Sequence, residues 1–199
     1  MTEARIQFSK LKGFPNCNDH DKIETEEFLA ASNEIVDVIR SFGTLFTPVI
    51  SDMSGNIAKI RKSYEKDPVK YKYLEDLIIL NVNVDNFAAN ALLWLKRGLQ
   101  LICTFFENIF HDKESTEVVK KHLLDAYEKT LKPYHGFIVQ STIKIMYSWV
   151  PTRSQLIGNG PQHDENIKVL ETFLPTMRAH LDRIDNLLKK YDLDDKSKV

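Results

Sequence analysis

The chain has 199 residues, of which 43% are hydrophobic and 28% charged, and its formal net charge is −1. A chain of this length buries roughly 70% of its unfolded surface on folding, so its core needs neither a disulfide nor a metal. The balanced charge excludes a nucleic-acid binder that relies on a broad basic field. We therefore expect a single monomeric domain over residues 1–199, with no metal, no cofactor and no nucleic-acid partner.

The N-terminal segment MTEARIQFSKLKGF lacks the apolar stretch of a secretory signal. The most hydrophobic segment, residues 87–106, is interrupted by Lys96 and Arg97 and falls short of a membrane span. These features favour a soluble, cytoplasmic protein. Cys17 is expected to be an exposed thiol in an irregular N-terminal segment of about 20 residues, and Cys103 a buried core residue.

The first half of the chain predicts three helices. The first covers about residues 23–40 and stops at Gly43, and the second starts near Pro48, because proline suits the first turn of a helix. One buried stripe follows the second helix at helical spacing. Its members are Met53, Ile57, Ile60 and Tyr64. Asp67-Pro68 is expected to begin the third helix.

The second half predicts four more helices. A fourth, about residues 86–110, is apolar nearly all round and should be central, and a fifth covers 115–131. Pro133 is expected to open a sixth helix, about 134–149, with His135 in its first turn. The last covers 165–191 with a kink at Pro175, and the polar tail DLDDKSKV is expected to fray. The fold class is therefore all-α.

Sequence motifs of catalysis are missing from the chain. It contains no HExxH, no Gly-rich phosphate loop, no Gly-x-Ser-x-Gly and no Cys-x-x-Cys. Its six histidines are scattered singly. We therefore expect a protein that is not an enzyme.

Three short segments carry polar groups beside apolar ones. In DMSGNIAK, Asp52, Asn56 and Lys59 fall within roughly a 60° arc on the flank of the buried stripe, where a groove would open. In ALLWLKRGL, the Trp94 indole is suited to stack on a sugar ring, and Arg97 would pair with an acid or hold a backbone carbonyl. In YHGFIVQ, His135 offers a ring nitrogen to an amide ligand.

Each segment alone has an ordinary structural explanation. The Asp52–Lys59 arc is also what a solvated helix face with an ion pair looks like. Trp94 is equally suited to the core, and His135 to capping or core packing. No single segment decides between these alternatives.

Taken together, FTPVISDMSGNIAKI, LLWLKRGL and KPYHGFIVQ, in this order, resemble the signature of the glycolipid transfer protein family, in its sugar-headgroup branch. The resemblance runs from about Lys22 to the end of the sequence. It implies a two-layer all-α sandwich of about eight helices that encloses an apolar pocket. It also implies non-enzymatic transfer of glycosphingolipids between membranes.

The resemblance implies a role for each polar residue. Asp52, Asn56 and Lys59 would hydrogen-bond the first sugar while Trp94 stacks beneath it. His135 and Asp52 would engage the ceramide amide. The ligand would be a glycosphingolipid and the second partner a membrane surface that is contacted transiently.

Two further sets of residues follow from position within the matched segments. Candidates to line the slot for the hydrocarbon chains are Pro48, Val49, Leu131, Ile143, Met146 and Phe173, each of which is also an ordinary core residue. Phe137 and Trp149 are expected to touch the membrane, because aromatic side chains favour the interface. No polybasic run is present, so docking should be weak and reversible.

Two alternatives stay open at this point. The ceramide-1-phosphate branch of the family resembles this chain broadly but places cations where Asn56 and Trp94 stand, as a phosphate requires. A glycolipid sensor or scaffold would need the same pocket as a transporter. The exact sugar is undecided because of two differences from relatives. Asn90 stands where animal relatives usually carry leucine, and Ser197 replaces a tyrosine that helps to close the headgroup site in relatives.

Overall fold

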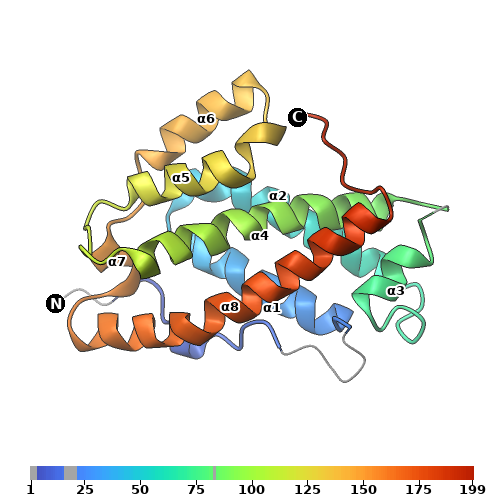
Figure 1. Ribbon diagram of the computed structural model, residues 1–199, viewed down its shortest axis with the longest axis horizontal. Coiled ribbons are helices and arrows are strands. Elements are labelled where there is room, and N and C mark those ends of the chain that lie inside the picture. The colour runs from blue at the N-terminus through green and yellow to red at the C-terminus, as the bar shows by residue number, and fades with distance from the viewer. Residues whose placement is uncertain (1–3, 16–21, 83) are drawn as a thin grey trace.

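The computed structural model describes residues 4–15, 22–82 and 84–199, and within these ranges it contains eight α-helices and no strand (Figure 1). The α-helices are α1 (Thr25–Arg40), α2 (Thr47–Tyr64), α3 (Leu74–Ile79), α4 (Phe87–His111), α5 (Lys120–Thr130), α6 (Phe137–Tyr147), α7 (Arg153–Ile157) and α8 (Pro161–Lys190). Three short 3-10 turns join them: η1 (Phe8–Lys10), η2 (Thr44–Phe46) and η3 (Lys132–Tyr134). The expected all-α class is confirmed.

Helix α4 lies at the centre of the molecule. Figure 1 shows α4 and α8 running across the near side, α1 and α2 behind them, and α5 and α6 at the upper edge. Because α4 is apolar on nearly every side, it packs against α2, α5 and α8 at once. Its Phe106 ring meets the Phe8 ring edge to face at 5.1 Å. This core fixes α2 and α4 side by side, which positions the site described below.

The third predicted helix starts later than expected. The Asp67 side chain accepts the N–H of Lys70 at 3.0 Å, which closes a local turn instead of a helix. The chain then runs extended beside the start of α1, where Thr25 N–H donates to the Lys72 carbonyl at 2.8 Å. Helix α3 begins only at Leu74. The prediction that Asp67-Pro68 begins a helix is therefore wrong.

The sixth predicted helix is also displaced. Pro133 lies in η3, and His135 follows with extended backbone (φ −103°, ψ 132°), so His135 precedes α6 instead of occupying its first turn. The backbone groups on either side of His135 are taken by Val199: its N–H donates to the Tyr134 carbonyl at 3.0 Å, and its carbonyl accepts from Gly136 at 2.6 Å. This pairing keeps His135 extended and outside α6.

The polar tail is ordered by the same contacts, so the expectation of a frayed tail is wrong. In addition, Leu193 N–H donates to the Leu188 carbonyl at 2.8 Å, which folds the chain back after α8. Figure 1 shows this segment rising from the end of α8 to the loop before α6. The last residues thus become part of the wall around His135.

The described part of the N-terminal segment is pinned to α8. The buried side chain of Asn166 accepts the Phe8 N–H at 3.0 Å and donates to the Ile6 carbonyl at 3.1 Å. Cys17 lies outside the described residues, whereas Cys103 is fully buried, as expected. Helix α8 continues through Pro175 and changes direction along its length (Figure 1).

No helix in residues 4–15, 22–82 and 84–199 is both long enough and apolar enough to cross a bilayer.

Candidate functional site

A cavity of about 570 Å³ opens between α2, α4, the loop before α6, and α6 itself. Its lining combines five of the polar or aromatic candidates from the sequence with an apolar wall. The polar and aromatic candidates are Asp52, Asn56, Lys59, Trp94 and His135. The structure therefore brings together residues from three separate segments of the chain.

The three polar residues of α2 line one side of the cavity. Asn56 is buried, and its side-chain oxygen accepts from Lys59 Nζ at 3.4 Å, while Asp52 and Lys59 reach solvent. Burial by the surrounding protein raises the pKa of the Asp52 carboxyl, although the charge of Lys59 and a hydrogen bond from Asn56 act in the opposite direction. The trio is therefore a row of acceptors and donors that a ligand with hydroxyl groups can use from the cavity.

Trp94 and His135 form the opposite side. Their rings stack with centroids 6.4 Å apart and planes 12° from parallel. The Tyr127 hydroxyl and His135 Nδ1 share a hydrogen bond at 3.1 Å, and Gln140 donates to the His135 carbonyl at 2.7 Å. Burial, with a smaller contribution from the positive charge of Arg97, lowers the pKa of His135. The imidazole is therefore neutral at pH 7 and fixed in orientation. Its Nε2 makes no hydrogen bond within the described part of the chain, so this nitrogen can bond a ligand.

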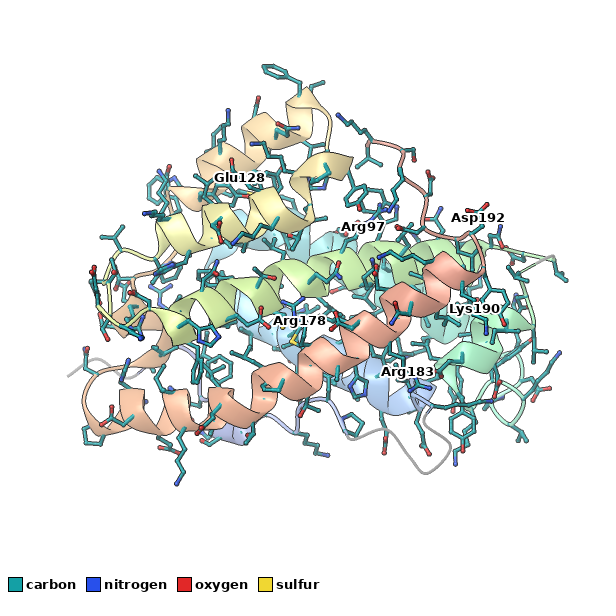
Figure 2. The ribbon with its side chains drawn as sticks, in the orientation of Figure 1. Arg97, Glu128, Arg178, Arg183, Lys190 and Asp192 are labelled. Carbon is teal, nitrogen blue, oxygen red and sulfur yellow. The ribbon has the colours of Figure 1, made fainter. Side chains whose placement is uncertain are left out.

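Arg97 lies behind Trp94 and is only 1% exposed. Its guanidinium carbon sits 4.9 Å from the centre of the Trp94 ring and 3.4 Å from that of Tyr134. It donates to the Asp194 carboxylate at 3.2 Å and to the Asp195 carbonyl. Figure 2 shows Arg97 reaching from α4 toward the chain that follows α8. Both sequence alternatives for Arg97, an acid and a backbone carbonyl, are thus realised together.

Five of the six candidates for the hydrocarbon slot line the cavity: Pro48, Val49, Leu131, Ile143 and Met146. Phe173 does not. Its ring packs against Phe8 at 5.9 Å, beside the N-terminal segment, and it is absent from the cavity wall. The structure therefore does not bring Phe173 together with the other five, because the N-terminal segment packs against that part of α8.

Sequence reasoning missed several lining residues. The further lining residues are Met53, Gly98, Leu101, Ile138, Val139, Thr142 and Val199. Asn90 also lines the cavity, although the sequence analysis noted it only as a difference from relatives. Gly98 had a detectable signal, since it lies one turn after Trp94 on the same face of α4. A Cβ there would meet Met53 at 3.3 Å, so the glycine lets α2 and α4 approach closely.

Helix α6 presents an apolar outer face. Phe137 is 84% exposed, Ile138 81%, and Ile145 and Trp149 65% each. Ile138, Ile145 and Trp149 repeat at helical spacing, although Trp149 lies just past the end of α6. Ile138 also lines the cavity. The exposed apolar face and the cavity are therefore continuous.

Comparison with known proteins places this architecture in a class. The chain is 31% identical over 188 residues to a zebrafish (Danio rerio) pleckstrin homology domain-containing family A member 8, covering 86% of this chain and 34% of that protein. It thus spans about a third of the length of that relative. It is 28% identical to the zebrafish glycolipid transfer protein, covering 87% of this chain and 90% of that protein.

Solved structures agree. A FAPP2 structure with the GLTP fold superposes with a TM-score of 0.83 at 27% identity, covering 98% of this chain and 97% of that one. The mouse ceramide-1-phosphate transfer protein superposes with a TM-score of 0.82 at 18% identity, covering 96% of each chain. At that identity the second match shows the fold alone.

The helical architecture, with an apolar cavity that carries polar groups along its sides, is the fold that this chain shares with the glycolipid and ceramide-1-phosphate transfer proteins. The chain belongs to the glycolipid transfer protein family, whose model, described as Glycolipid transfer protein (GLTP), matches residues 23–159, more than half of the chain.

Proposed function

We propose that this chain binds a glycosphingolipid and carries it between membranes. The sugar is held by Asp52, Asn56 and Lys59 with Trp94 beneath it, and the ceramide amide by His135 and Asp52. The observation that carries the proposal is the single cavity onto which all five side chains open together with an apolar wall. Since each buried CH₂ contributes about 0.8 kcal/mol, the apolar wall lets the ceramide cross water shielded by protein.

The charges around the cavity favour a sugar over a phosphate. Asp52 carries a negative charge and Lys59 a positive one, so the polar side of α2 is electrically balanced. His135 is held neutral, and the Arg97 guanidinium is turned away to Asp194 and the Asp195 carbonyl. A phosphate would meet one cation and one carboxylate, whereas phosphate recognition relies on several cationic donors.

The relatives support the same choice. The FAPP2 structure is described as one that selects simple glycosphingolipids using the GLTP fold, and it shares 27% of its residues with this chain. The ceramide-1-phosphate transfer protein shares the fold at lower identity. Asn56 and Trp94, which the sequence resemblance places where that branch has cations, support the sugar as headgroup.

We also propose that α6 docks on the membrane. Phe137 and Trp149 were the expected contacts, and the exposed side chains of Ile138 and Ile145 extend the same surface. Exposed apolar residues on one helix face insert into the interface of a bilayer. Because Ile138 belongs to both this face and the cavity wall, docking brings the cavity to the lipid.

The test is transfer of a labelled monohexosylceramide between vesicles, run beside labelled ceramide-1-phosphate. We expect the sugar lipid to move, and Asp52→Val and Trp94→Ala to slow it by about tenfold or more, the effect of roughly 1.4 kcal/mol. Matched controls are Asp37→Val on α1 and Phe87→Ala on α4, both exposed and outside the cavity wall. These should transfer at the unmodified rate.

Transfer of ceramide-1-phosphate without transfer of the sugar lipid would reverse the choice of headgroup. Tight binding of the sugar lipid without any transfer would instead establish the sensor or scaffold role. The single domain, the monomeric state and the cytoplasmic location stay predictions, which gel filtration with light scattering and cell imaging check.

A further inference from the structure

A second cavity, of about 430 Å³, lies on the other face of α4, between α4, α5, α8 and the chain after α8. Its lining is polar where the first cavity is apolar. Five cationic side chains line it: Lys96, Lys129, Arg178, Lys189 and Lys196. Figure 2 shows Arg178 on the part of α8 that lies beside α4. None of these five belongs to the proposed lipid site.

Only three carboxylates share this lining, so it carries an excess of two positive charges. Asp185 accepts from both Lys96 at 2.7 Å and Lys189 at 2.5 Å. Glu107 accepts from Arg178 through both of its oxygens, at 3.0 and 2.5 Å. Asp194 is shared between Lys196 and the buried Arg97. Every carboxylate of the lining is thus already engaged, and two take two cations each.

The cations keep donors to spare. Lys96 is almost fully buried and makes one ion pair, although an ammonium group has three protons to donate. Lys129 pairs with Asp125, outside the cavity lining. The Gln100 amide lines the cavity and makes no side-chain hydrogen bond within the described part of the chain. These side chains therefore bring more hydrogen-bond donors to the second cavity than its lining has acceptors for.

The missing component is an acceptor with negative charge. A carbohydrate is disfavoured, since the aromatic ring in this lining, Tyr134, is already covered by Arg97. A metal cation is disfavoured by the excess positive charge. A phosphate group has several oxygens that accept from different directions at once, and ammonium groups bind it as point charges. The donors on α4, α5 and α8 surround such a group.

We propose that this polar cavity is a second binding site, for a small phosphate-bearing anion, distinct from the lipid site. The phosphate oxygens accept from Lys129 and Lys189 at the entrance and from Lys96 and Gln100 deeper in. Both entrance lysines are more than half exposed, so they turn toward a ligand without disturbing the core. The anion is either a free phosphate ester or the headgroup of a lipid with an exposed phosphate.

The test measures binding of inorganic pyrophosphate to the full chain by isothermal titration calorimetry at low salt, in the absence of any lipid. We expect saturable binding that weakens with salt. Lys129→Gln with Lys189→Gln should weaken it by about tenfold or more, because two charge contacts are lost. The matched control, Lys132→Gln with Lys190→Gln, removes the same charge from η3 just after α5 and from the end of α8, and should change the affinity less than about twofold.

A second arm uses phosphatidylcholine vesicles with and without phosphatidic acid. Saturable pyrophosphate binding lost in the entrance pair supports a free phosphate ester as ligand. Added vesicle binding with phosphatidic acid, lost in the same pair, with no pyrophosphate binding, supports a lipid headgroup. Neither binding, or equal loss in the control pair, overturns the proposal. Asp52→Val should leave the pyrophosphate affinity unchanged, which separates this site from the proposed function.

Discussion

The two cavities on either side of α4 are built from alternate faces of one helix. The first cavity is lined by four residues of α4: Asn90, Trp94, Gly98 and Leu101. The second cavity is lined by four others: Lys96, Gln100, Thr104 and Glu107. Both sets repeat at three- or four-residue steps, so each occupies one side of the helix. In the first cavity the polar groups are fixed by packing and by single hydrogen bonds, such as those of Tyr127 with His135 and of Lys59 with Asn56. In the second, they are held by shared ion pairs.

The carboxylates of the two cavities differ in the same way. Burial dominates for Asp52 and raises the pKa of its carboxyl. Burial acts on Asp185 as well, but hydrogen bonds and charges from Lys189 and Lys96 outweigh it and lower the pKa of that carboxyl. A central helix can therefore present two chemical environments on its two sides, because the partners on α2 and α8 differ.

Replacing the buried Arg97 should have the largest effect on stability. Arg97→Met keeps a side chain of similar length but loses the contacts to Asp194 and the Asp195 carbonyl. We expect the free energy of unfolding to fall by about 3 kcal/mol, since a buried charge pair is broken. Urea denaturation measures it, with the exposed Lys190→Met as control. A loss below about 1 kcal/mol would mean that the contacts of Arg97 to Asp194 and to the Asp195 carbonyl contribute little to stability.

Asp185→Asn should have the next largest effect, because it leaves the buried Lys96 without its carboxylate. We expect a loss of about 2 kcal/mol at neutral pH. The pKa of Asp185 is lowered in the folded protein, so the carboxylate contributes stability above its ordinary pKa of 3.8, and this is lost as the pH falls through the lowered pKa. The difference between the two proteins should therefore shrink in acid. A constant difference down to low pH would contradict the ion pair as its source.

Asp52→Asn should have the smallest effect and the opposite sign. The pKa of the Asp52 carboxyl is raised in the folded protein, so folding disfavours its ionised form. The folded protein is therefore most stable below the pKa that Asp52 has in the unfolded chain, and it loses stability as the pH rises through the raised pKa of the folded state. At neutral pH the asparagine variant should be more stable by a few tenths of a kcal/mol, since Asp52 reaches solvent. Urea denaturation at neutral pH checks that the asparagine variant is the more stable protein, and urea denaturation at acid pH checks that the difference in stability disappears. Destabilisation at neutral pH would contradict burial as the dominant cause.

The regular parts of the fold were predictable from the sequence, because they depend on helical periodicity. The stripe on α2 and the apolar surface of α4 identified both helices and the central position of α4. The arc of Asp52, Asn56 and Lys59 on the flank of that stripe follows from the same geometry. Helix α7 had a signal that was overlooked: Thr152 and Gln155 form a reciprocal capping box, a pattern readable in the sequence.

What failed depends on contacts between distant segments. His135 leaves the helix because Val199 takes the backbone groups beside it, and no local pattern encodes a partner 64 residues away. The tail after α8 is polar in composition, yet Arg97 and Tyr134 order it. The composition of a segment and the spacing of its residues do not predict contacts between segments that are distant in the sequence.

The segment after α8 also fixes when the site can be completed. Its contacts reach back to Arg97 and to the loop at Tyr134 and Gly136, separations of up to about a hundred residues. Contacts so distant in sequence form late, after the loop between them has closed. During synthesis the walls contributed by α2, α4 and α6 are all outside the ribosome before residues 194–199 exist. A nascent chain therefore has an open cavity edge and an unanchored His135 loop until residues 194–199 have emerged and paired with it.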